Sequence, residues 1–155
     1  MYLYRAFLEL DRRVKALAAA DPICQLLMSA PGVGYVAALT FKAAVDDPAR
    51  FRKSKTVAAH FGLTPRRYQS GERDNPGRIS KAGDVEVRSA LFLAANVIMN
   101  RRGKPSALRS FGTRLSRSKG RKRAIVAVAR KLAVVLHTMW TDGTLYCSGE
   151  KEAIA

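Results

Sequence analysis

The chain has 155 residues, enough for one domain with a hydrophobic core, and its hydrophobic fraction of 48% is ordinary for a globular protein. Its 28 Lys and Arg face only 12 Asp and Glu, which gives a formal net charge of +16. The pI of 10.7 is typical of a nucleic-acid binder, and no apolar run approaches the roughly 20 residues that a bilayer span needs. Without a visible secretion signal or a cysteine pair at metal-ligand spacing, we expect a cytoplasmic protein with reduced thiols.

The first twenty residues carry an apolar stripe at the a/d spacing of a coiled coil, formed by Leu3, Phe7, Leu10, Val14 and Leu17. Two alternatives stay open: this helix packs on its own domain, or it pairs with another chain. The pattern begins without a capping residue before it. We therefore expect residues 1–20 to be the end of a coiled-coil linker helix that belongs to something longer.

A helical hairpin is predicted next. Asp21 followed by Pro22 is the start signal of a helix over residues 23–28. The run Pro31-Gly32-Val33-Gly34 then predicts a tight turn before a small-residue helix over 35–41, as in a helix-hairpin-helix, with Val33 buried between the helices. The two glycines permit close backbone approach, and the free amides of the second helix favour a phosphate oxygen. The alternative is a turn that serves packing alone.

The segment from residue 62 to 84 fits neither the helical nor the strand period, so it is predicted to be a long basic loop. Asp47 is expected to cap a short turn before it, and Ser54 to cap a helix that ends at Gly62. Such a loop is often functional or disordered. Its functional interpretation is a loop that closes on a phosphate chain and presents Ser70. The cations that it contributes are Arg66, Arg67, Arg73, Arg78 and Lys81.

Two further helices are predicted after this loop. The first is capped by Asp84, buries Val87 to Ile98 at helical spacing and carries Arg88 on the side nearer the loop. Residues 101–123 are a basic stretch without any acid, for which a polyanion is the natural partner. The last helix runs over residues 122–141 with Gly143 as its stop. Its first residues, Arg121, Lys122 and Arg123, oppose the helix dipole, which suggests a phosphate shared with the helix amides.

No alternating Val/Ile/Thr-rich run predicts a strand, so the expected fold is all-α. It consists of a linker helix over 1–20, one helical domain over 21–144 and a frayed tail over 145–155. His60 and His137 are each interpreted as a helix-surface or core residue rather than a metal ligand. No metal site is expected within this chain.

Several of these segments together resemble the C-terminal domain of the insertion-sequence 110/116/902 transposases, the bridge-RNA-guided recombinases. The similarity extends from about residue 22 through the last helix. Each motif alone is weak, but their combination in this order is specific. The segments that carry the resemblance are Leu27–Gly34, Phe61–Pro65, Ser70-Gly71, Gly77–Asp84 and Arg88.

The resemblance implies a bacterial, nucleoid-associated DNA recombinase in which the serine matching Ser70 attacks a phosphodiester and forms a phosphoserine link. Tyr68 is the alternative hydroxyl nucleophile. The family also has an N-terminal nuclease-like domain whose four carboxylates hold Mg²⁺, and this sequence shows no such domain. We therefore expect a fragment, a split gene product or a decayed copy that is incomplete alone. The partners implied are DNA, a guide RNA and a second copy joined through the N-terminal helix.

The residues themselves support this chemistry in part, because a serine hydroxyl needs a base or a positive field to become reactive. A non-catalytic helix-hairpin-helix module that binds DNA, or the remnant of a truncated transposase, is the main alternative. A third hypothesis is an RNA-binding accessory protein. The expected phosphate-binding residues are Gly32, Gly34, Arg66, Arg67, Arg73, Arg78, Lys81, Arg88, Arg121, Lys122 and Arg123.

Overall fold

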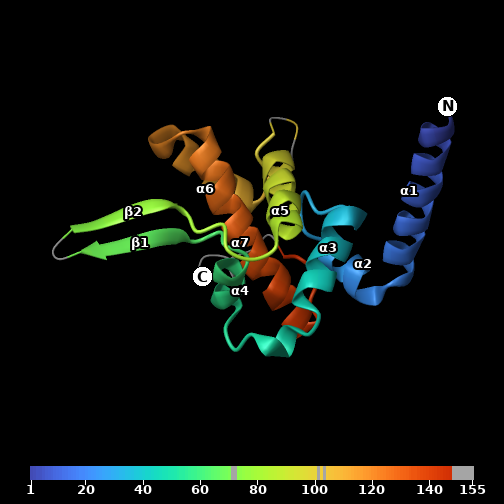
Figure 1. Ribbon diagram of the computed structural model, residues 1–155, viewed down its shortest axis with the longest axis horizontal. Coiled ribbons are helices and arrows are strands. Elements are labelled where there is room, and N and C mark those ends of the chain that lie inside the picture. Colours follow the sequence, from blue (N-terminus) through green and yellow to red (C-terminus); the bar gives the residue numbers. More distant parts are fainter. Residues whose placement is uncertain (71–72, 101, 103, 148–155) are drawn as a thin grey trace.

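The computed structural model describes residues 1–70, 73–100, 102 and 104–147, and for residues 67–70 and 73–76 it describes the backbone alone. Helices form the body of the protein, and a two-stranded ribbon projects from it (Figure 1). The all-α prediction is therefore confirmed, with one small sheet added. The elements in chain order are α1 (Tyr2–Ala20), α2 (Pro22–Met28), α3 (Tyr35–Val45), η1 (Pro48–Arg50), α4 (Ser54–His60), β1 (Pro65–Ser70), β2 (Arg73–Ile79), α5 (Val85–Ile98), α6 (Ala107–Lys119) and α7 (Arg121–Asp142).

The central element is α7, which packs against α2, α4, α5 and α6. Its predicted apolar stripe is buried, with Val128, Leu132 and Leu136 fully inaccessible to solvent. Gly143 ends the helix in the left-handed conformation that favours glycine, as predicted. By length and composition α7 is the one described helix that could cross a bilayer, but half of the relevant stretch is buried inside the protein. Its apolar character is therefore explained by its place in the core.

His137 joins the start of α4 to α7 inside the core, which confirms its interpretation as a core residue. Its Nε2 lies 2.9 Å from the carbonyl oxygen of Pro48, and its Nδ1 lies 2.8 Å from Oγ of Ser54. A carbonyl can only accept, so Nε2 donates and Nδ1 accepts from the Ser54 hydroxyl. The prediction that Ser54 caps α4 is wrong, because α4 begins at Ser54 itself and its hydroxyl is committed to His137. The predicted capping by Asp47 and Asp84 is confirmed.

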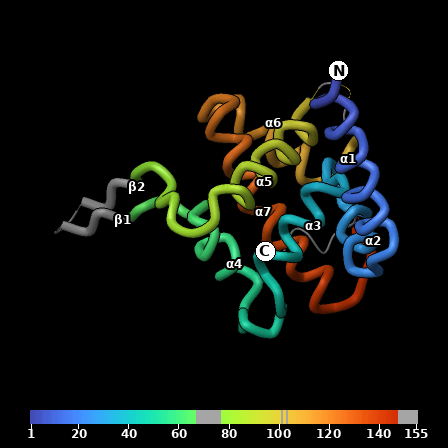
Figure 2. The backbone as a smooth tube through the Cα atoms, turned by 45° about the vertical axis from the view of Figure 1, so that its right-hand side comes forward, coloured from blue at the N-terminus to red at the C-terminus, as the bar shows by residue number. Residues whose placement is uncertain are grey.

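The predicted stripe of α1 is not buried by this chain. Leu3, Phe7, Leu10 and Leu17 are between 57% and 84% exposed, because α1 contacts the body through another face. That face includes the buried Ala18, and Asp11 accepts a hydrogen bond from the hydroxyl of Tyr35 on α3. The helix therefore packs on its own domain through this other face, while Val14 alone of the predicted stripe is half-buried, and pairing with another chain stays a prediction. Helix α1 and the ribbon lie at opposite ends of the body (Figure 1, Figure 2).

The predicted loop over residues 62–84 is wrong in its local structure, because β1 and β2 pair antiparallel there, with an irregularity between Pro65 and Arg67. The strands were missed because a strand is recognised by alternating burial, and this segment is polar and contains Pro76 and Gly77. Backbone hydrogen bonds, not a buried face, define the ribbon. Such an isolated two-stranded unit is marginal by itself and must be held at its base.

Helix α6 is the element that the sequence analysis missed inside the basic stretch 101–123. Ser106 caps it through a 3.1 Å hydrogen bond to the amide of Arg109, and Leu108 and Gly112 face the core. A Cβ on Gly112 would lie 2.6 Å from Cγ2 of Val128, so the absent side chain lets α6 lie close to α7. The many cations had obscured the short apolar stripe that marks this helix.

At the C-terminus, residues 148–155 of the predicted tail lie outside the described residues. Tyr146, in the described part of the tail, is half-buried, and its amide donates a hydrogen bond to the hydroxyl of Ser29.

Asp21 caps α2, as predicted, and also ties α2 to α3. Its carboxylate accepts the amides of Ile23 and Cys24, at 2.8 and 3.2 Å, and pairs with Lys42 of α3. The Lys42 ammonium, aided by the two amides, lowers the pKa of Asp21 below its usual value. By contrast, burial raises the pKa of the Cys24 thiol, which is a free cysteine in the core. Because the ionised form of Asp21 is favoured in the folded state, its contribution to stability is complete above the unfolded pKa and is lost as the pH falls through the lowered folded pKa.

We predict that Asp21→Asn keeps the cap but loses the Lys42 pair, and so lowers the free energy of unfolding by roughly 0.5–1 kcal/mol at pH 7. The difference from wild type should begin to shrink as the pH falls through the pKa of an aspartate in the unfolded chain, about 3.9, and should vanish only below the lowered pKa of Asp21 in the folded protein. Urea unfolding at pH 7 and pH 3 measures both quantities. Glu9→Gln, which removes an exposed charge on α1, is the control. A deficit that is the same at both pH values, or one that the control shares, would contradict the role of the pair.

Candidate nucleic-acid interface

The base of the ribbon is a close backbone crossing. Gly62 and Gly83 both have positive φ, of 70° and 80°. A Cβ on Gly62 would lie 2.2 Å from the carbonyl oxygen of Ala82, and one on Gly83 would lie 2.2 Å from that of His60. Gly62 also ends α4 as predicted, because its amide bonds Ala59 at 2.9 Å while the Leu63 amide bonds Ala58 at 3.0 Å. The two sides of the ribbon can therefore meet only because neither glycine has a side chain.

Arg88 fastens this crossing from α5. Its Nη1 lies 2.9 Å from the carbonyl oxygen of Ala82, 3.2 Å from that of Gly83 and 3.3 Å from that of Phe61. The guanidinium thus binds the end of α4 and the chain that leaves the ribbon at the same time. Arg88 lies beside the segment that was predicted to be a loop, as expected, but its observed bonds are to backbone carbonyl oxygens. A phosphate contact of Arg88 would therefore have to use its other N–H donors.

The described cations of the ribbon lie around this base. Arg66 is exposed and donates from Nη2 to the carbonyl oxygen of Ser80, at 3.0 Å across the ribbon. Arg78 is exposed, and Lys81 is exposed with a positive φ of 55° just after β2. These three predicted phosphate-binding residues are therefore brought together on one projecting unit, where a polyanion can reach them.

The remaining ribbon candidates are placed by their backbone only. Ser70 ends β1 and pairs in register with Arg73, while Tyr68 pairs with Asn75 and Arg67 with Pro76. The side chains of Arg67, Tyr68, Ser70 and Arg73 lie outside the described residues. Ser70 as the nucleophile and Tyr68 as its alternative therefore stay predictions. Both residues lie in the part of β1 that is farther from the body.

The predicted Gly32–Gly34 turn borders a groove of about 550 Å³, the turn groove. Lys104, Ser106 and Tyr146 line its other side, together with Val97 of α5. Val33 is 7% exposed, which confirms its predicted burial. The two glycines differ in role. A Cβ on Gly32 would lie 2.5 Å from the carbonyl oxygen of Ala94, whereas one on Gly34 would meet nothing within 4 Å. Gly32 is thus required for packing, and Gly34 leaves the start of α3 open.

Gly34, the residue that precedes the first amides of α3, lines this opening. Gly34 is the N-cap of α3, and no side chain caps the helix there. The first amides of a helix have no partner within it, and together with the helix dipole they attract anions. The groove therefore combines unsatisfied donors with the positive charge of Lys104 in one place. Sequence reasoning named the turn but missed Lys104, which lies far from it in the chain.

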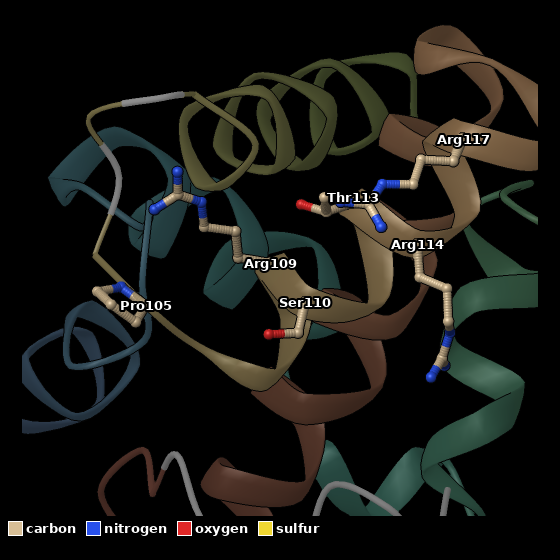
Figure 3. Close-up of a pocket in the computed structure, with 6 residues that line it drawn as sticks. All are labelled: Pro105, Arg109, Ser110, Thr113, Arg114 and Arg117. Atoms are coloured by element: carbon tan, nitrogen blue, oxygen red, sulfur yellow. The ribbon is translucent and has the colours of Figure 1, made fainter.

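A second depression, of about 460 Å³, lies along the exposed face of α6 (Figure 3). It is lined by Pro105, Arg109, Ser110, Thr113, Arg114 and Arg117. Sequence reasoning recorded these arginines as part of a basic stretch but did not propose them as site residues, because the helix that aligns them was not recognised. Their spacing of i, i+5 and i+8, with Thr113 at i+4, is the signal that could have identified one helical face.

The predicted cations at the start of α7 separate into two groups. Arg121 donates to Oδ1 of Asn96 at 3.1 Å and lies 3.5 Å from the carbonyl oxygen of Met99, so it also binds the end of α5. Its charge then lies near the negative end of the α5 dipole, which offsets the cost that it imposes on α7. Lys122 and Arg123 are exposed. No acidic residue occurs between Glu86 and Asp142, so α6 and the start of α7 form a region of one charge sign.

We predict that Gly83→Ala loosens the ribbon base far more than Gly143→Ala does. Both positions have positive φ, so both variants carry the left-handed strain of about 1–2 kcal/mol, but only at Gly83 does a Cβ collide with backbone. Urea unfolding and hydrogen exchange of the Ser80 and Lys81 amides, which bond Thr64 and Gly62, measure the difference. Equal losses in the two variants, with unchanged exchange of those amides, would show that the crossing is not constrained as described.

Comparison with known proteins gives a consistent result. A family model described as Transposase IS116/IS110/IS902 family matches residues 24–111. The chain is 34% identical over 140 residues to the transposase for insertion sequence element IS1111A of Coxiella burnetii, covering 90% of this chain and 38% of that protein. Identity is 30% over 137 residues to an IS110 insertion-element protein of Streptomyces coelicolor, covering 88% and 33%. It is 29% over 146 residues to the transposase for insertion sequence element IS1328 of Yersinia enterocolitica, covering 94% and 44%. The chain thus spans less than half the length of these relatives.

Proposed function

Because the chain belongs to the IS116/IS110/IS902 transposase family, we propose that it is the DNA-binding, serine-bearing part of a transposase that cuts and rejoins DNA. The observation that carries the proposal is the turn groove. There the uncapped start of α3 and the ammonium of Lys104 border the same opening, in a chain of net charge +16. Amides at a helix start bind phosphate oxygens without regard to base sequence, and so do lysines. The groove therefore positions the sugar-phosphate backbone.

The ribbon would supply the chemistry. In the proposed step, Oγ of Ser70 forms a bond to phosphorus, its proton passes to a base, and the bond from phosphorus to the leaving sugar oxygen breaks as that oxygen gains a proton. The serine ester conserves the phosphodiester linkage, so attack by another sugar hydroxyl can rejoin the strand. Arg73, which pairs with Ser70 in the register of the ribbon, would stabilise the negative charge that develops on phosphorus oxygens. A ribbon held firmly by Arg88 can keep this geometry.

Magnesium does not fit the residues at hand. Among the described residues, no group of three or more His, Cys, Asp or Glu side chains gathers in a way that could hold a metal ion. The proposal therefore assigns Mg²⁺, and the base that accepts the serine proton, to a separate carboxylate-bearing domain. This chain would then act only together with that domain.

Assembly of two copies through α1 is part of the same proposal. The exposed stripe of α1 has coiled-coil spacing, and α1 projects from the body with this stripe uncovered. A second copy that presents the same stripe would cover it. Sedimentation of the wild-type chain beside a Leu3→Glu, Leu10→Glu variant distinguishes a dimer from a monomer.

We predict that Gly34→Val and Lys104→Ala each weaken binding to duplex DNA while the fold persists. A Cβ at position 34 meets no atom within 4 Å, and a valine there would cover the α3 amides. Loss of one phosphate contact lowers the slope of log affinity against log salt by about 0.9. Fluorescence anisotropy over a salt series, with urea unfolding as the check on folding, measures this. Lys15→Ala on α1 is the matched control. If Lys104→Ala and Gly34→Val bind as the control does, the turn groove is not a phosphate site.

We predict that Ser70→Ala abolishes the covalent protein–DNA adduct when the chain is supplied with a carboxylate-bearing partner domain, while affinity for DNA changes little. Denaturing gel electrophoresis of labelled DNA detects the adduct. Ser89→Ala, an exposed serine on α5, should leave the adduct intact. An adduct that survives Ser70→Ala but is lost with Tyr68→Phe would move the nucleophile to the tyrosine.

The second candidate function is a helix-hairpin-helix module that binds DNA without chemistry. The turn groove favours it equally, because phosphate binding there requires no nucleophile. It is distinguished by salt-sensitive binding with no adduct under any condition. A guide RNA is a further proposed partner, since the basic surfaces suit a folded RNA as well. Competition between a structured RNA and duplex DNA for the same labelled chain decides which polymer binds more tightly.

A further inference from the structure

The depression along α6 is a cationic surface that the turn groove and the ribbon do not explain. Five of its six lining residues come from one face of α6, and Pro105 precedes the helix (Figure 3). The opposite face, with Leu108 and Gly112, packs on α7. The polar face is therefore held by the core, and its side chains spread from it in several directions around the depression (Figure 3).

The charges on this face are not neutralised by neighbouring acids in the sequence, because none occurs between residues 87 and 141. Arg114 and Arg117 lie one turn apart, where like charges destabilise a helix by a few tenths of a kcal/mol. The helix dipole favours a cation in the last turn and so accounts for Arg117, but not for Arg114. Ser110 and Thr113 add hydroxyl donors between the guanidiniums. The face thus presents donors and positive charge together, which is the chemistry that phosphate oxygens accept.

The depression also continues the turn groove. Pro105 lines both of them, with Lys104 and Ser106 on the turn-groove side and Arg109 on the α6 side. From residue 109 to residue 117 the helix rises about 12 Å, at 1.5 Å per residue. One strand of duplex DNA carries a phosphate about every 3.4 Å along its axis, so this length matches roughly three phosphates.

We propose that the α6 face binds the backbone of duplex DNA without reading its bases, as the continuation of a track that begins at the turn groove. No aromatic side chain lines the depression, whereas single-strand binders stack bases on aromatic rings, so a duplex is favoured over a single strand. The inference rests on the proposed function in taking DNA as the polymer. It adds a contact surface that the resemblance of short motifs did not indicate.

The test compares two double variants of equal charge. Arg114→Ala with Arg117→Ala removes two cations from the α6 face, and Arg12→Ala with Arg13→Ala removes two exposed cations from α1. Anisotropy with a 20-base-pair DNA of arbitrary sequence, over a salt series, gives the slope of log affinity against log salt. The α6 variant should lower the slope by about 1.8, which corresponds to two lost phosphate contacts, and the α1 variant should leave it unchanged. Urea unfolding of both variants confirms that the fold is kept.

Each outcome decides the inference. Equal slopes for the two variants, or a lowered slope only with an RNA duplex of the same length, would overturn it. A wild-type chain without salt-dependent affinity for DNA would overturn the proposed function as well. If Lys104→Ala weakens DNA binding and the α6 variant does not, the turn groove stands and the α6 track alone fails. A second pair, Ser110→Ala with Thr113→Val, should weaken affinity without changing the slope, because hydroxyls carry no charge.

Discussion

The crossing at the base of the ribbon is the constraint on which the functional half of this protein depends. Gly62 and Gly83 bring two backbone segments closer than any side chain would allow, and Arg88 bonds carbonyl oxygens on both segments. A two-stranded ribbon with little apolar surface has no core of its own. Its position relative to α5 and α4 therefore comes from these backbone contacts. The position of any residue on the ribbon, Ser70 included, therefore depends on how firmly the backbone contacts at this base are maintained.

Arginine has two distinct tasks in this chain, which composition alone cannot separate. Arg88 and Arg121 both bind backbone carbonyl oxygens. Arg88 binds them around the ribbon base, and Arg121 binds one at the end of α5. Arg114 and Arg117 instead line a depression open to solvent. Some of the arginines thus stabilise helix ends and the chain crossing, and other cations form the surfaces that we propose for a polyanion. Counting cations would overestimate the interface, since some of them are already engaged.

The arrangement of the elements gives the transposase family match a physical meaning. The family model covers residues 24–111, which begin in α2 and end within α6. This range contains the turn groove except for Tyr146, the ribbon and its base, and part of the α6 face. Helix α1 lies outside it and exposes a coiled-coil stripe at the far end of the body from the ribbon. In our proposal, the element for assembly, α1, and the element for the chemistry, the ribbon, therefore lie at opposite ends of one small helical body (Figure 1, Figure 2).

Local chemistry is enough to predict the caps at Asp21, Asp47 and Asp84, the stops at Gly62 and Gly143, and the buried stripe of α7. These follow from neighbours within a turn or two, as does the Gly-Val-Gly turn. Tertiary structure decided the rest. The ribbon has no pattern of alternating burial by which a sequence could predict it, and the cations of α6 obscured the apolar stripe of that helix. The hydroxyl of Ser54 bonds to the distant His137 and therefore does not cap α4. Lys104 and Gly34 line one groove only because the chain that enters α6 lies beside the turn, a proximity that no local pattern encodes.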